Sequence, residues 1–121
     1  NKTELEKRTK HFALRTIEFV ATLPQPKACS VIEYQLVKAA TSVGANYREA
    51  NRAESRADFV HKIAIVEKEA SESCFWLELC DEGDLGEPQQ RSTLLQESRE
   101  TLAIFTTVGR TTKADSARAG N

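Results

Sequence analysis

The sequence predicts an all-α fold, an antiparallel up-down-up-down four-helix bundle that forms a single domain over residues 1–121. Apolar residues recur three and four positions apart in four successive segments, as they do on one face of a helix. Between these segments stand prolines, glycines and capping residues, which end one helix and begin the next. Because the connections between the first three helices are short, we expect these helices to be antiparallel neighbours.

The first expected helix begins at Thr3, whose hydroxyl can form a capping box with Glu6. It ends before Pro24 and Pro26, because proline lacks the backbone N–H and disfavours helix in the residue before it. The apolar stripe of this helix consists of Leu5, Phe12, Ala13, Ile17, Phe19 and Val20.

The second helix is expected to open at Ser30, with Glu33 again three residues later. Inside this helix Gly44 costs roughly 1 kcal/mol relative to alanine. A close approach of a neighbouring helix would compensate for that cost, so we expect a tight crossing at Gly44. The apolar stripe consists of Ile32, Leu36, Ala39, Ala40, Val43, Tyr47 and Ala50.

The third helix is expected to follow Ser55, because this hydroxyl and Asp58 can satisfy the unpaired N–H groups of a helix start. It is the longest of the four and runs to about Asp81. The glycines and proline of Glu82–Pro88 then predict a loop. The apolar stripe of the third helix consists of Phe59, Ile63, Val66, Ala70, Cys74 and Leu77.

The fourth helix starts after Pro88 and is expected to stop at Gly109. The small, polar residues of about 110–121 predict a frayed or disordered tail. The apolar stripe of the fourth helix consists of Leu94, Leu95, Leu102, Phe105 and Val108.

Composition and cysteine count predict a cytoplasmic protein that does not enter a membrane. No apolar run approaches the roughly 20 residues of a membrane helix, and the charged start of the chain lacks a signal-peptide stretch. An odd number of cysteines favours reduced thiols. We interpret Cys29, Cys74 and Cys80 as small buried hydrophobic residues.

The residues offer no catalytic or metal-binding constellation, so we expect neither an enzyme nor a cofactor or metal. His11 and His61 lie on different predicted helices. His61 could form part of a metal site with Asp58 or Glu67. Helix bundles build such sites from Glu-x-x-His pairs repeated on facing helices, and these pairs are missing from the sequence.

Charge is unevenly distributed although the net charge is only −1. Bases outnumber acids from Lys2 to Arg15, and acids predominate from Glu67 to Glu87. A chain with one basic and one acidic end can bind a polyanion or stack on itself. The other interpretation is ordinary solvated helix faces.

A basic stripe near the joint of the second and third helices is the candidate nucleic-acid site. Arg48 and Arg52 lie four residues apart on one face, Arg56 follows at the joint, and Lys62 lies further along. Clustered arginines at such a joint can hold phosphates. The first helix adds the further candidates Lys7, Lys10 and Arg15.

A structural interpretation of the same arginines is that they brace the joint through ion pairs. Their acidic neighbours in the sequence are Glu49, Glu54 and Asp58. Exposed ion pairs of this kind contribute about 0–1 kcal/mol each.

The adjacent aromatic residues Phe75 and Trp76 cannot both face one core, because neighbouring helix residues point about 100° apart. We expect Trp76 or its neighbour Leu79 to be left for another surface. Apolar surface left over in this way predicts self-association.

The segment TSVGANYREANRAE, Thr41 to Glu54, continues as SRADFVHKIAIVEKEASESCFWLEL to Leu79. These residues resemble the four-helix-bundle family of 23S ribosomal-RNA intervening-sequence proteins. The resemblance implies a small cytoplasmic bacterial bundle that assembles into a homopentamer and carries no catalytic residues. A related branch, the accessory proteins of diversity-generating retroelements, implies binding of RNA or DNA and of a reverse transcriptase as protein partner.

Two functions are therefore expected. The first is a non-catalytic homo-oligomeric scaffold or interaction protein. The alternative is an RNA- or DNA-binding accessory module that holds phosphates without reading base edges.

Overall fold

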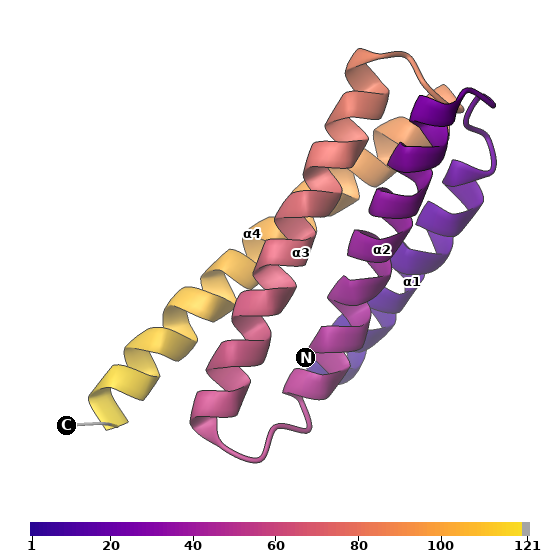
Figure 1. Cartoon of the computed structure of the whole chain (residues 1–121). Helices are drawn as coiled ribbons and strands as arrows, with labels where there is room; N and C mark the ends of the chain where they lie inside the picture. The colour runs from indigo at the N-terminus through magenta and orange to yellow at the C-terminus, as the bar shows by residue number, and fades with distance from the viewer. Residues whose placement is uncertain (120–121) are drawn as a thin grey trace.

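The computed structural model describes residues 1–119 and contains four α-helices. These are α1 (Lys2–Val20), α2 (Lys27–Ala50), α3 (Arg56–Glu82) and α4 (Pro88–Ala119). Successive helices run in opposite directions, and the described residues include no strand (Figure 1). Each of α1 and α3 packs against both α2 and α4. The predicted all-α four-helix bundle is confirmed.

The core consists of two apolar clusters, one in each half of the bundle. One cluster includes Phe12, Phe19 and Leu77, and the other is built around Val43, Ile63 and Phe105. The structure adds buried hydroxyl residues that the apolar stripes did not include. They are Thr9, Thr16, Ser73, Ser98 and Thr101.

The core face of α1 differs from the predicted stripe. Ile17 is 48% exposed, whereas Thr9 and Thr16 are fully buried. The Thr16 hydroxyl donates to the carbonyl of Phe12 at 2.8 Å, and the Thr9 hydroxyl donates to that of Leu5 at 3.0 Å. Because these hydroxyls are satisfied within their own helix, threonine can occupy core positions.

Two of the predicted helix starts are wrong. Asn1 caps α1, because its side chain accepts from the N–H of Glu4 at 2.9 Å, and Thr3 lies inside the helix. Asparagine is a stronger N-cap residue than threonine, which favours the start at Asn1. The second helix begins at Lys27, directly after Pro26, rather than at Ser30. The third start is confirmed, since the Ser55 hydroxyl accepts from the Asp58 N–H at 3.0 Å.

The close crossing expected at Gly44 is present between α1 and α2. A Cβ added to Gly44 would lie 3.4 Å from the backbone carbonyl of Thr9. This distance is an ordinary van der Waals contact. The two helices therefore meet backbone to backbone, and the gap still leaves space for one methyl group.

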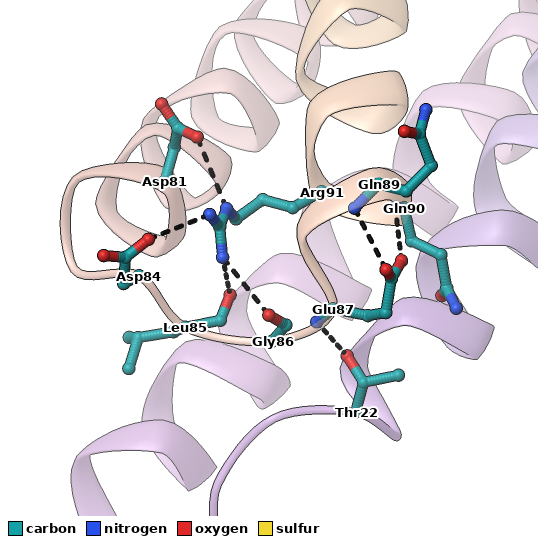
Figure 2. Close-up of polar contacts among 9 residues, drawn as sticks. All are labelled: Thr22, Asp81, Asp84, Leu85, Gly86, Glu87, Gln89, Gln90 and Arg91. Carbon is teal, nitrogen blue, oxygen red and sulfur yellow. Dashed lines mark hydrogen bonds and ion pairs between the residues drawn. The ribbon is translucent and has the colours of Figure 1, made fainter.

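The predicted loop between α3 and α4 is held by the side chain of Arg91 (Figure 2). Its guanidinium donates to the carbonyls of Leu85 and Gly86 at 3.1 and 3.2 Å. It also donates to the carboxylates of Asp81 and Asp84 at 3.3 and 3.1 Å. One side chain of α4 thus fixes both the end of α3 and the turn that follows.

Glu87 links the same loop to the first turn of α4 and to the α1–α2 loop (Figure 2). Its carboxylate accepts from the N–H groups of Gln89 and Gln90 at 3.2 and 2.7 Å. Its own N–H donates to the hydroxyl of Thr22 at 2.9 Å. The two loops at this end of the bundle are therefore joined.

The predicted end of α4 at Gly109 is wrong. The helix continues to Ala119, so most of the expected tail is helical, and residues 120–121 lie outside the described part. Gly109 is buried against α3, where an added Cβ would lie 3.0 Å from a carboxylate oxygen of Glu67. Glycine here marks a close helix contact rather than a helix end.

The aromatic pair on α3 is also arranged differently from the prediction. Phe75 is 52% exposed and Leu79 is 39% exposed. Trp76 is half-buried against the core and donates from its Nε1 to Glu72 at 3.3 Å. One of the two aromatic residues is left outside the core, as expected, but it is Phe75 rather than Trp76. The alternative prediction that Leu79 faces another surface is confirmed. No helix within residues 1–119 is both long and apolar enough to cross a membrane.

Candidate nucleic-acid interface

The bundle separates its charges along its long axis. The half near the α2–α3 loop comprises residues 1–10, 41–66 and 105–119 (Figure 1). It carries eleven cationic and six acidic side chains, and we call it the basic half. The other half, residues 11–40 and 67–104, carries six cationic and twelve acidic side chains, and we call it the acidic half. Folding thus turns a nearly neutral chain into a charge-segregated molecule.

Arg48 and Lys10 are brought together in a groove of about 330 Å³ between α1 and α2. Glu6 and Glu49 line the same groove. Arg48 lies 3.9 Å from Glu6 and is 52% exposed. Glu6 also accepts from the side-chain amide of Asn51 at 2.8 Å. The positive charge of this groove is therefore largely balanced by its own carboxylates.

The ion pairs expected to brace the joint with Glu49, Glu54 and Asp58 do not occur among the described residues. Arg48 instead turns to α1, and Arg56 turns to α4, where it donates to the backbone carbonyl of Asp115 at 3.2 Å. The expected pairs are absent from residues 1–119 because residues one or two positions apart on a helix, such as Arg48 and Glu49, do not face each other.

The joint itself presents Arg52, Arg56 and Lys62 near the start of α3. Arg52 and Arg56 are exposed, and Lys62 is partly exposed. The final turns of α4 bring three further cations to the same half, and the sequence analysis missed them because it assigned them to a tail. They are Arg110, Lys113 and Arg118.

An open groove of about 820 Å³ lies between the first turn of α3 and the last turns of α4. It is lined by two arginines, an aromatic ring, a carboxylate and a hydroxyl. These residues are Arg56, Phe59, Thr112, Asp115 and Arg118. The Arg118 guanidinium pairs with the Asp115 carboxylate. This groove is the place where guanidinium groups from two helices meet.

The remaining candidates on α1 do not join this cluster. Lys7 is exposed in the basic half. Arg15 lies in the acidic half and pairs with Glu18 at 2.7 Å. It lines a groove of about 710 Å³ between α1 and α4 together with Glu97 and Glu100. The seven predicted residues therefore lie on at least three separate surfaces.

Arg8 is the main link between α1 and α4 on that side. It donates to Glu97 at 2.7 and 2.8 Å, in a two-pronged pair, and to Glu100 at 3.0 Å. The bond to Glu97 raises the pKa of Arg8. Bonds from Gln96 and then from Arg8 lower the pKa of Glu100. These charges hold the two helices together and are not available to a ligand.

The cysteines and histidines do not form a reactive or metal-binding cluster within residues 1–119. All three cysteines are buried free thiols, which agrees with their interpretation as packing residues. Burial raises the pKa of the Cys80 thiol to about 11 and also raises the pKa of Cys74. Both thiols are therefore kept protonated, the form that is a poor nucleophile. His11 lies on α1 and His61 on α3.

By its fold and its surface, the protein is a small all-α bundle with an excess of cations in one half and of acids in the other. Residues 1–107 match the family model described as 23S rRNA-intervening sequence protein. The chain belongs to this family.

A solved structure supports the same assignment. It is the crystal structure of a protein with unknown function from the S23 ribosomal protein family of Bacteroides thetaiotaomicron VPI-5482. The two sequences are 32% identical, the match covers 86% of this chain and 96% of the other, and the TM-score is 0.77. No curated protein matches the chain.

Proposed function

We propose that the protein is a non-catalytic homo-oligomeric scaffold of the bacterial cytoplasm, and that the oligomer is a homopentamer. The observation that carries this proposal is apolar surface without a partner in the single chain. Six large apolar side chains are between 39% and 63% exposed. All six lie in the acidic half, on α1, α2 and α3. They are Leu14, Ile17, Val31, Tyr34, Phe75 and Leu79.

Large apolar side chains left exposed in one half of a molecule favour a protein–protein contact, because their removal from water is favourable. A second copy of the chain is the occupant that the family resemblance implies. The charge of the basic half stays outside this contact, since none of the six residues lies there. A scaffold of this kind would present its basic ends to a further partner.

The oligomeric state tests the proposal. Light scattering of the native chain at micromolar concentration should give a multiple of the 13.5 kDa chain mass. The double variant Tyr34→Glu/Phe75→Glu should shift the mass toward one chain, because each glutamate would bury a charge at the contact. A matched control is Ser92→Glu, which adds a charge at an exposed polar position of α4. A native mass of one chain at this concentration would reject the scaffold proposal.

The second candidate function is RNA or DNA binding by the basic half. The charge segregation favours it, because the excess of cations is concentrated in one half of the bundle. The residues that would contact phosphates are Arg48, Arg52, Arg56 and Lys62, with Lys7 and Lys10 from α1. A mobility shift with structured RNA should weaken steeply as salt rises, since phosphate contacts release counterions.

The triple variant Arg48→Ala, Arg52→Ala, Arg56→Ala should bind that RNA more weakly than the native chain at low salt. Equal affinity of the two proteins would exclude this set of residues. No binding by either protein at low salt would exclude the second candidate function and leave the scaffold proposal in place.

A further inference from the structure

The groove between α3 and α4 is completed by a segment of α4 that the family match does not include. The family model ends at residue 107, and the α4 residues that line the groove are Thr112, Asp115 and Arg118. No residue of α1 or α2 lines it. Arg56 and Phe59 lie within the matched residues, so the groove combines a matched α3 side with an α4 side beyond the match.

The two arginines of the groove are only partly used by the protein. Arg56 donates one hydrogen bond to the Asp115 carbonyl at 3.2 Å, and Arg118 pairs with the Asp115 carboxylate. A guanidinium has five N–H donors in a planar fork that matches phosphate oxygens. Both side chains are largely exposed and keep donors for an anion.

Phe59 supplies the apolar part of the groove. It packs against the core cluster of the basic half and is only half-buried. Its ring is therefore held in place while part of it borders the groove. A fixed aromatic ring beside two guanidinium groups is a combination that binds a base and its phosphates.

Further exposed cations lie in the same half of the bundle as the groove. Arg110 and Lys113 lie on the same turns of α4 but on the face opposite the groove, and Arg52 lies in the loop before α3. Glu54 and Asp58 are the nearby acids in the sequence, and Asp58 lies at the start of α3. The groove therefore lies in the half of the bundle that carries the excess of cations, which favours the approach of a chain of phosphates.

We propose that this groove binds single-stranded nucleic acid, with Arg56 and Arg118 on phosphates and a base stacked on Phe59. The proposal rests on the second candidate function and assigns it a site and a strand form. Duplex bases are already stacked on one another, so only an unpaired base can use the ring. An acidic polypeptide would meet the same cations, but its carboxylates gain nothing from an aromatic face.

The test uses the full chain and a fluorescein-labelled oligouridylate of about 12 nucleotides, a length within the range of single-strand sites. Fluorescence anisotropy is measured from low to high salt. Arg56→Gln/Arg118→Gln should lower the slope of log affinity against log salt by about 1.4, because two phosphate contacts are lost. Phe59→Leu should lower the affinity about fivefold to hundredfold with little change in slope.

The matched control is Lys27→Gln/Arg99→Gln, which removes the same charge from exposed positions in the acidic half. It should bind as the native chain does. Circular dichroism and thermal melting establish that each variant is folded, and Phe59→Leu keeps an apolar side chain against the core for this reason.

Four outcomes would overturn the proposal, and they differ in what they leave standing. If the native chain binds but the groove variants bind equally well, nucleic acid binds elsewhere and the second candidate function survives. If the native chain does not bind at low salt, the groove proposal and the second candidate function are both rejected. If duplex RNA binds as tightly and Phe59→Leu has no effect, the stacking assignment is wrong. If poly-L-glutamate displaces the probe as well as unlabelled oligouridylate does, the groove is a site for acidic polypeptides.

Discussion

The side chain of Arg91 is 8% exposed, although it carries a full charge. Burial of a charge is costly unless the group is paired and hydrogen-bonded. Its partners are Asp81 in the last turn of α3, and Asp84 and two backbone carbonyls in the α3–α4 loop. A single residue therefore determines the geometry of a whole connection.

Arg91→Ala should lower the free energy of unfolding by about 2–3 kcal/mol, because bonds to a charged donor are lost and the loop carbonyls lose their partner. Chemical denaturation of the two proteins measures this difference. Arg99→Ala is the control, since Arg99 is 61% exposed and lies 3.8 Å from Glu78. It should change stability by no more than about 0.5 kcal/mol. Equal effects of the two substitutions would contradict the role assigned to Arg91.

The buried thiol of Cys80 predicts how the stability of the protein depends on pH. Its pKa in the folded protein, about 11, is above the ordinary value of 9.0 because burial disfavours the thiolate. The contribution of this thiol to stability is therefore complete below pH 9 and is lost as the pH rises toward 11. Melting temperatures between these pH values should fall more steeply for the native chain than for Cys80→Ala. Parallel pH profiles would show that Cys80 does not titrate in this way.

At the scale of elements, two glycines differ in whether their position could accept a side chain. Gly44 lies inside α2 with space for a methyl group, whereas Gly86 has a φ of +83°. A Cβ on Gly86 would come within 2.6 Å of the Phe19 ring. The sequence predicted a close crossing at Gly44, yet of these two glycines it is Gly86 that has no room for a side chain.

Gly44→Ala should raise the free energy of unfolding by about 0.5–1 kcal/mol, because alanine is the better helix former and the gap accepts its methyl group. Gly86→Ala should lower it by more than about 1 kcal/mol, because backbone strain and a clash coincide. Thermal denaturation of both variants beside the native chain measures the two changes. A destabilised Gly44→Ala protein would mean that the crossing is tighter than a 3.4 Å contact indicates.

The last turns of α4 are an element whose stability depends on few contacts. Both core clusters are formed by residues up to 105, and among their partly buried neighbours only Val108 lies later in α4. A chain that ends at residue 107 should therefore keep the bundle and lose only about 1–2 kcal/mol of unfolding free energy. Circular dichroism and melting of the shortened chain test this expectation. Failure of this chain to fold would mean that the α3–α4 contact after residue 107 is essential.

At the scale of the whole molecule, the separation of charge matters more than the net charge. The chain is nearly neutral, yet one half has an excess of cations and the other an excess of acids. Antiparallel packing produces this pattern, because it brings the basic start of α1 to the same end of the bundle as the end of α2, the start of α3 and the last turns of α4. The apolar side chains left exposed lie in the acidic half, so self-association and polyanion binding would use different ends.

The sequence by itself determined the number of helices, the positions of the connections and most of the core. These features depend on local signals, namely a period of 3.6 residues, proline and glycine breaks, and the Ser55 cap. Because these signals are local, they also explain the wrong predictions for the start of α1 and the end of α4. Asn1 and Thr3 both suit a cap, and a glycine such as Gly109 can mark either a helix end or a close contact.

Only the tertiary structure decided which side chains meet. Arg48 pairs with Glu6 on another helix instead of with its neighbour Glu49, and Arg56 reaches the carbonyl of Asp115 across 59 residues of sequence. The predicted basic stripe was therefore divided among separate surfaces, and the arginine of the last α4 turns became part of a groove. The physical reason is that helix periodicity specifies the face on which a residue lies, whereas its neighbour across that face depends on how the helices pack.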